Sequence, residues 1–151
     1  MLTFEKSTLI DAPVERVWEF HERADILSLL TPPWQPVKVL RREGGLGVGA
    51  ITEFEIQLGL IEMKWLARHT DCVPYEYFVD RQIEGPCQSW VHRHQFTPEG
   101  NQTRLTDTIR LELFGGEIAE FLLGSFVIDR LEDMFTYRHQ VTQRYCPLPI
   151  N

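Results

Sequence analysis

The chain has 151 residues, of which 43 % are hydrophobic and 25 % charged, values typical of globular proteins and far from those of disordered chains. With 15 Lys and Arg against 22 Asp and Glu, the formal net charge is −7, so no basic excess favours nucleic acid as a partner. The cysteines, Cys72, Cys87 and Cys146, are widely spaced without a C-x-x-C pair, which argues against a disulfide framework and a thiolate zinc site. The length favours one domain over residues 1–151, and the cysteine usage favours a cytoplasmic protein.

The sequence shows neither a targeting pattern at its start nor a membrane-spanning pattern along its length. Residues 1–6 lack the basic and apolar parts of a secretion signal. The longest nearly continuous apolar stretch, residues 121–128, is far shorter than the roughly 20 residues of a bilayer span. We therefore expect no transmembrane segment, while the oligomeric state stays open between a monomer and a weak dimer.

The amino-terminal part predicts one strand and two short helices. Residues 2–10 have the pattern of a strand, and Asp11 stands where it can cap a helix over residues 12–22, which has a proline in its first turn. A second helix, about residues 24–30, ends before a pair of prolines that cannot continue it.

From Pro36 onward the hydrophobic period changes to about two, which indicates strands. Turns rich in Gly, Pro and Asn divide this stretch, and their shortness predicts antiparallel neighbours. The predicted strands cover residues 36–42, 50–58, 61–72, 76–84, 88–97 and 103–114. After Gly115 and Gly116 a helical period returns for about 25 residues, and the tail from about 144 to 151 has an irregular pattern. The apolar positions expected on or near one side of this helix are Ile118, Phe121, Leu122, Phe126, Ile128, Leu131, Met134 and Phe135.

This order of elements predicts an α+β fold. Seven antiparallel strands in one sheet twist and curl, and the final helix is the one long amphipathic element that can cover the concave face. We expect a curved seven-stranded antiparallel sheet around a long carboxyl-terminal helix, with two short helices after the first strand. Because a curved sheet and a straight helix touch along a line, space for a small molecule remains between them.

Several segments also resemble a known superfamily. They are "STLIDAPVERVWEF", the glycine loop after the second strand, "GPCQSWVHRHQF", "TRLTDTIRLELF" and "LEDMFTYRHQ". Together, over about residues 3–143, they resemble the SRPBCC or START-like superfamily, and in pattern the polyketide cyclase/dehydrase and ligand-binding SRPBCC proteins of bacteria. The resemblance implies a helix-grip fold with an internal ligand cavity and the glycine loop at its mouth. Because the superfamily includes lipid carriers, hormone receptors, co-chaperones and some enzymes, the fold is compatible with several functions.

Two neighbouring strands carry polar side chains on faces that are otherwise apolar. One inward face is expected to consist of Trp90, His92, His94 and Phe96. On the following strand, Asp107 shares its face with several aliphatic residues. If the hairpin pairs Phe96 with Leu105, His94 lies across from Asp107.

A third strand is expected to add an arginine to this group. Arg81 alternates with Tyr77, and a tight turn after this strand would bring Arg81 beside His92. An unpaired ionisable group in a core costs several kcal/mol, so these groups should satisfy one another or a bound molecule. The predicted polar group is Arg81, His92, His94 and Asp107.

Three interpretations of this polar group stay open. The first is a structural hydrogen-bond network. The second is the polar end of a ligand cavity, with Arg81 binding a carboxylate or enolate and the histidines binding a hydroxyl or carbonyl. The third is catalysis, with His94 oriented by Asp107 as a general acid or base.

The remaining candidates are cavity walls. Tryptophans are core residues by default, and this applies to Trp18, Trp34, Trp65 and Trp90. Of these, Trp65 and Trp90 are the best wall candidates, and Arg138 of the last helix can reach the rim. The full predicted ligand-binding set is Arg81, His92, His94, Asp107, Trp65, Trp90, Phe96, Tyr77, Met134 and Arg138.

A metal is a weaker hypothesis. A His-x-His pair on one strand face can hold a metal only with a third ligand, and the one plausible addition is His69. Since neither a carboxylate nor a thiolate completes that set, we expect no metal and no cofactor.

The favoured function is the binding of a small hydrophobic ligand, such as a lipid, a polyketide-like compound or an aromatic compound. One alternative is a cyclase or dehydratase that uses a cavity histidine without a metal. A second is a protein-interaction or stress-related module acting through outward residues such as Glu53 and Glu55, which alternate with apolar neighbours.

Overall fold

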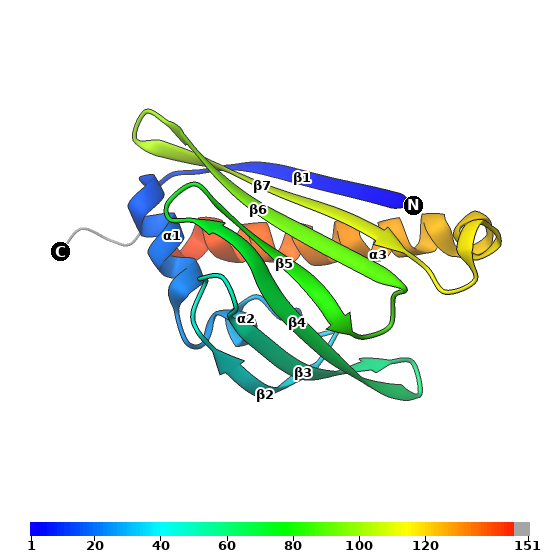
Figure 1. The fold of residues 1–151 in the computed structure, drawn as a ribbon. Helices are drawn as coiled ribbons and strands as arrows, with labels where there is room; N and C mark the ends of the chain where they lie inside the picture. The colour runs from blue at the N-terminus through cyan, green and yellow to red at the C-terminus, as the bar shows by residue number, and fades with distance from the viewer. Residues whose placement is uncertain (147–151) are drawn as a thin grey trace.

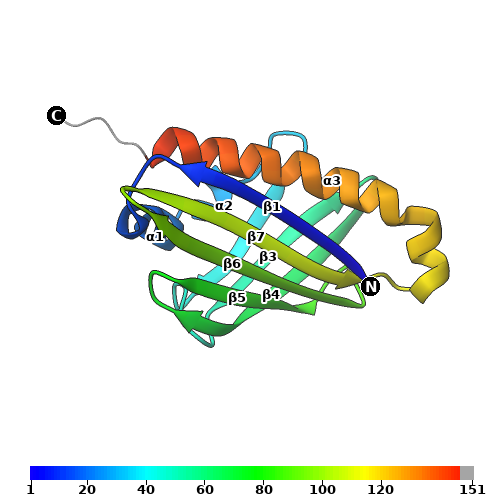
Figure 2. The same ribbon diagram turned by 90° about the horizontal axis from the view of Figure 1, so that it is seen from above.

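The computed structural model describes residues 1–146, which form one antiparallel sheet and a long helix across it (Figure 1). The elements in chain order are β1 (Leu2–Ile10), α1 (Val14–Glu22), α2 (Ile26–Leu29), β2 (Val37–Glu43), β3 (Ile51–Leu58), β4 (Ile61–Val73), β5 (Tyr77–Glu84), β6 (Ser89–Glu99), β7 (Gln102–Glu112) and α3 (Gly116–Tyr145). The strand order is β1-β7-β6-β5-β4-β3-β2. Seen from above, the sheet curves along one side of α3 (Figure 2). The predicted α+β helix-grip architecture is confirmed.

Two helix ends differ from the sequence-based expectation. The N-cap of α1 is Pro13, without a side-chain hydrogen bond, so the capping role predicted for Asp11 is wrong. Helix α3 runs for 30 residues and includes Arg144 and Tyr145, with Cys146 as a C-cap of helical geometry, so the irregular tail predicted from about residue 144 is wrong for these three residues. The remainder of that predicted tail, residues 147–151, lies outside the described residues. No helix in the described part of the chain is both long enough and apolar enough to span a membrane.

The pairing of β6 with β7 follows the predicted register. Phe96 lies opposite Leu105, and His94 lies opposite Asp107. Because both partners at each position point to the same side of the sheet, the histidines of β6 and the carboxylate of β7 meet on the inner face.

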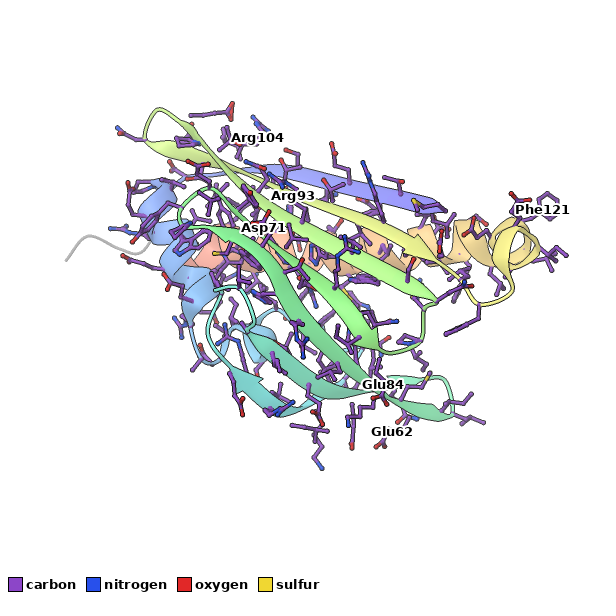
Figure 3. All side chains as sticks on the ribbon, in the orientation of Figure 1. Glu62, Asp71, Glu84, Arg93, Arg104 and Phe121 are labelled. Atoms are coloured by element: carbon purple, nitrogen blue, oxygen red, sulfur yellow. The ribbon has the colours of Figure 1, made fainter. Side chains whose placement is uncertain are left out.

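The facing of β5 is the reverse of the prediction. Asp80, not Arg81, lies opposite His92, and Arg81 lies opposite Val91 with its side chain exposed. Tyr77 shares the outer face, where it donates a hydrogen bond to Asp71 and carries the Arg93 guanidinium 3.8 Å above its ring. Asp71 and Arg93 are labelled on the face away from α3 in Figure 3. Arg81 and Tyr77 are therefore not cavity residues. The apolar side chains on both faces of this strand made alternation an ambiguous guide.

Helix α3 covers the sheet with its second half. Phe135 is 2 % exposed and packs against Phe4 with ring centroids 5.4 Å apart. The expectation that the whole apolar series faces the sheet is wrong, since the members near the start of α3 are exposed. These are Ile118, Phe121, Leu122 and Phe126.

Length explains why the start of α3 projects beyond the strands. At about 1.5 Å per residue the 30 residues of α3 span roughly 45 Å, whereas the nine residues of β1 span roughly 30 Å. Phe121 is accordingly 89 % exposed and lies at the overhanging end of α3 (Figure 3).

The core is divided into two clusters. One surrounds α1, where Trp18 packs edge-on against Phe96 with ring centroids 5.1 Å apart. The other surrounds Phe135 of α3. Phe96 is 1 % exposed and belongs to the first cluster, so its predicted place in a cavity wall is wrong.

A cavity with a buried histidine–aspartate cluster

A cavity of about 260 Å³ lies between the inner face of the sheet, α2 and the second half of α3. Its walls are mostly apolar. The apolar lining residues include Ile26, Leu30, Phe54, Ile56, Ala67, Phe78, Leu131 and Phe135. The loop between β2 and β3 closes one side, because Leu46 at its tip is buried and lines the cavity. Its backbone carbonyl is hydrogen-bonded by His69 Nδ1 at 2.9 Å, which ties the loop to β4.

Two tryptophans form one wall of the cavity. Trp65 of β4 and Trp90 of β6 both line it and meet edge to face, with ring centroids 5.0 Å apart. From the other side, Met134 and Arg138 of α3 line the same space. The structure thus brings these four predicted wall residues together. Trp34, by contrast, is 55 % exposed, so its assignment to the core is wrong.

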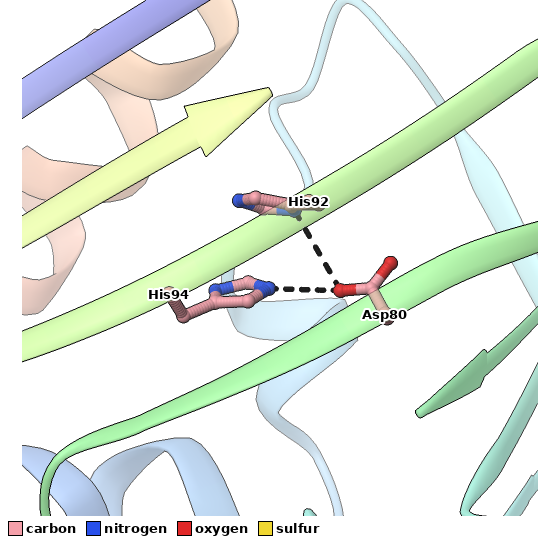
Figure 4. Close-up of side chains that lie close together, drawn as sticks. All are labelled: Asp80, His92 and His94. Atoms are coloured by element: carbon pink, nitrogen blue, oxygen red, sulfur yellow. Dashed lines mark hydrogen bonds and ion pairs between the residues drawn. The ribbon is translucent and has the colours of Figure 1, made fainter. Parts of the chain in front are cut away.

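The polar end of the cavity is formed by Asp80, His92 and His94, which all line it (Figure 4). Asp80 Oδ2 lies 2.9 Å from His94 Nε2 and 3.7 Å from His92 Nδ1. The two imidazole rings are tilted by 33° to each other, with centroids 3.6 Å apart. Alternation along β6 fixes this arrangement, since residues two apart point to the same side.

Asp107 lies behind the two histidines, deeper in the protein. Its Oδ1 accepts a hydrogen bond from His92 Nε2 at 2.8 Å and forms an ion pair with His94 Nδ1 at 3.0 Å. Its Oδ2 meets His139 Nε2 at 2.6 Å, and His139 Nδ1 meets Thr8 Oγ1 at 2.6 Å. Asp107 is not among the residues that line the cavity, so its direct contacts are with the three histidines rather than with the cavity space.

The charges in this cluster are strongly coupled. Burial disfavours a charged His94, but hydrogen bonds to Asp107 and Asp80 outweigh burial and raise its pKa to about 9. Burial and the neighbouring His94 charge lower the pKa of His92. Burial opposes a charged Asp107, yet hydrogen bonds from His139, His92 and His94 hold the pKa of Asp107 well below its usual range. The cluster therefore holds an imidazolium at His94 beside a neutral His92.

Arg138 completes the polar end from the α3 side. Its guanidinium carbon lies 5.2 Å from the centroid of the Phe135 ring. Within residues 1–146, Arg138 Nε is a buried donor without a hydrogen-bond partner. Burial lowers the pKa of Arg138, and the charges of Asp107 and Asp80 oppose that effect. Arg138 thus brings a buried positive charge to this end of the cavity.

Sequence reasoning missed Asp80 and His139. Asp80 stands two positions from Phe78, whose buried aromatic ring would have set the inner face of β5 correctly. His139 follows Phe135 by one helical turn on the same side of α3. In place of the predicted Arg81, the structure puts Asp80 on the sheet side of this group, and Arg138 supplies a guanidinium from α3.

Comparison with known proteins bears on this geometry. Residues 10–136 match the model of the family described as "Polyketide cyclase / dehydrase and lipid transport". The chain belongs to this family. A search of curated proteins finds no match.

Solved structures of several proteins share the fold. TTHA0849 from Thermus thermophilus is 19 % identical with a TM-score of 0.75, over 96 % of this chain and 97 % of that chain. The nucleoside-diphosphate sugar epimerase from Corynebacterium glutamicum is 27 % identical with a TM-score of 0.73, over 95 % of this chain but 28 % of the epimerase. The di-domain ARO/CYC StfQ from the steffimycin biosynthetic pathway is 14 % identical with a TM-score of 0.73, over 95 % of this chain and 50 % of that chain.

Proposed function

We propose that the protein binds a small hydrophobic molecule, such as a lipid, a polyketide-like compound or an aromatic compound, in the cavity against α3. The observation that carries this proposal is a mostly apolar cavity of about 260 Å³ with polar groups gathered at one end. Apolar walls with a few convergent polar groups are typical of small-molecule sites. The family description, which includes lipid transport and polyketide cyclases, supports the same role.

The polar groups define how such a ligand is oriented. The apolar body of the ligand packs against Trp65 and Trp90, where burial contributes about 25 cal/mol per Å² of apolar surface. A carbonyl, carboxylate or enolate oxygen pairs with the positively charged guanidinium of Arg138, which lines the cavity. Arg138 thus takes the anchoring role that the sequence assigned to Arg81.

A pair of substitutions on β4 tests ligand binding. Ala67 lines the cavity, whereas the adjacent Arg68 is exposed on the outer face, so Ala67→Leu and Arg68→Leu introduce the same side chain on opposite sides. Titration with the fluorescent probe 1-anilinonaphthalene-8-sulfonate should show binding by the wild type and by Arg68→Leu. Ala67→Leu should weaken binding because it fills the cavity. Thr52→Leu, at the facing cavity position on β3, should do the same.

Two outcomes would overturn the ligand-binding role. One is equal binding of the probe by Ala67→Leu and Arg68→Leu. The other is the loss of binding in the outer-face variant alone. Circular dichroism of each variant checks that the fold is kept, and native mass spectrometry of the purified wild type would reveal a hydrophobic compound that co-purifies with it.

A second candidate function is acid–base catalysis of the cyclase or dehydratase type. The observation that favours it is His94, which lines the cavity and is held between Asp80 and Asp107 in one orientation. In this role His94 moves the proton and Asp107 is a positioning residue. Turnover of an identified substrate should be lost in His94→Gln, and unchanged turnover would remove the catalytic role. The interaction-module alternative, through Glu53 and Glu55, stays a prediction.

A further inference from the structure

The histidine pair of β6 lies between two carboxylates. On the deep side, Asp107 Oδ1 is within hydrogen-bond distance of His92 Nε2 and His94 Nδ1, at 2.8 and 3.0 Å. An ionised carboxylate can only accept, so both of these ring nitrogens carry hydrogens. The opposite nitrogens, His92 Nδ1 and His94 Nε2, face Asp80, and in the metal-free protein the His94 Nε2–H donates to Asp80 Oδ2 at 2.9 Å. A metal ion that displaces this one proton meets three donor atoms that already converge.

We propose that Asp80, His92 and His94 bind a divalent transition-metal ion at the polar end of the cavity. The candidate ligand atoms of these three residues all lie within 4.8 Å of one another. This inference goes beyond the proposed ligand-binding role, because uptake of a metal can be measured without an organic ligand. It also revises the expectation that no metal binds, which assumed His69 as the only third ligand.

The spacing of the ligand atoms fits such an ion. Metal–ligand distances of about 2.1 Å place ligand atoms about 3.4 Å apart in a tetrahedral site. The observed separations from Asp80 Oδ2, 2.9 Å to His94 Nε2 and 3.7 Å to His92 Nδ1, lie on either side of this value (Figure 4).

The hydrogen bonds behind the histidines strengthen the case. Metal-binding histidines usually donate their second ring N–H to a carboxylate, which fixes the tautomer and the ring orientation. Asp107 supplies this carboxylate for both His92 and His94, and His139 holds the other oxygen of Asp107 in place. The two nitrogens that face Asp80 are thus pre-oriented for a metal.

The donor set indicates the class of ion. Two imidazoles and one carboxylate suit Zn²⁺ and Fe²⁺ rather than Mg²⁺ or Ca²⁺, which prefer oxygen ligands. The charges of Asp80 and Asp107 together match a divalent ion. Because all three ligands line the cavity, the remaining coordination positions open toward it. Arg138 on the same cavity favours an anionic group at those positions.

Titration of the metal-stripped full-length chain tests this inference. Zn²⁺ binding measured by calorimetry should give one equivalent, and Co²⁺ should give the visible absorption of a site with nitrogen and oxygen ligands. Asp80→Asn and His94→Gln should each weaken Zn²⁺ binding by more than about tenfold, the scale seen even for residues that only orient metal ligands. His69→Gln is the matched control, since it changes a buried histidine of the same cavity outside the proposed set.

Several results would overturn the metal site. They are the absence of saturable Zn²⁺ uptake by the wild type, unchanged affinity in Asp80→Asn, and an equal loss in His69→Gln. If the variants fail to fold by circular dichroism, X-ray absorption of the wild-type Zn²⁺ complex decides, with two imidazoles and a carboxylate expected at about 2.0–2.2 Å. Binding of 1-anilinonaphthalene-8-sulfonate by the metal-stripped protein tests the proposed ligand role separately, so either idea can fail alone.

Discussion

Replacement of Asp107 by Asn removes the charge at the centre of the buried cluster while it keeps the size of the side chain. The carboxylate accepts from His92, His94 and His139, and its side chain is 6 % exposed. An asparagine accepts only at Oδ1 and turns its NH₂ group toward the remaining ring nitrogen, so it either forces a histidine into another tautomer or leaves a donor unsatisfied. Asp107→Asn therefore removes one partner of a buried charged network.

The expected loss of unfolding free energy is about 3–5 kcal/mol, the usual cost when a buried ion pair loses one partner. Three separate charged hydrogen bonds at about 1.5–3 kcal/mol each would total about 4.5–9 kcal/mol, but shared partners make such terms non-additive, so the lower range is expected. With a urea m-value of about 2 kcal/mol/M, the midpoint of unfolding should fall by about 2 M. In the metal-free variant, the pKa of His94 should also fall from about 9, because one of its two carboxylate partners is neutral.

Urea unfolding followed by tryptophan fluorescence measures the first effect, and NMR titration of the imidazole measures the second. Asp133→Asn is the matched control, since Asp133 pairs with Arg130 on the exposed surface of α3 and should change stability by less than about 0.5 kcal/mol. A loss below about 1 kcal/mol in Asp107→Asn, or a His94 pKa that does not move, would refute the description of a charged buried network.

Three further predictions concern α3, pH and the thiols. Phe135→Ala should cost about 3–5 kcal/mol while Phe121→Ala costs less than about 0.5, measured by urea unfolding, and equal costs would contradict the overhang of α3. In the metal-free protein, the raised pKa of His94 gives stability that is complete below about pH 6.5 and is lost as the pH rises through 9, so stability that rises between pH 6.5 and 9 would contradict it. The depressed pKa of Asp107 gives stability that is lost as the pH falls below about 4, so stability that does not fall there would contradict it. Burial raises the pKa of Cys87 to about 11, so iodoacetamide at about pH 8 should modify this thiol in the unfolded protein and spare it in the native one, and equal rates would refute its burial.

The fold was predictable because turn residues and hydrophobic periods agree along most of the chain. The hairpin of β6 and β7 shows why its register could also be predicted. Strict alternation places Trp90, His92 and His94 on one face, and the turn after β6 fixes the pairing with Asp107. Where two strands share a short turn and each has one distinctly apolar face, the sequence determines which side chains meet.

Strand β5 and helix α3 lack such constraints. On β5 both faces carry apolar residues. Its pairing with β4 is interrupted by register shifts, so the alternation on β4 does not indicate which face of β5 points inward. The sequence therefore predicted an inward Arg81 instead of Asp80. On α3 the hydrophobic period continues beyond the edge of the sheet, and periodicity alone does not tell where the covered surface ends. His139 was missed because pairing between a helix and a strand depends on packing geometry that a single sequence does not encode.

The four tryptophans allow the central claim, a ligand-binding cavity between the sheet and α3, to be tested in one experiment. In NMR spectra, the indole N–H signals of Trp65 and Trp90 should shift when a small aromatic carboxylic acid such as 1-naphthoic acid is added, because both rings line the cavity. The signal of exposed Trp34 should stay in place. A shift confined to Trp34, or no shift at Trp65 and Trp90 at saturating acid, would contradict the account.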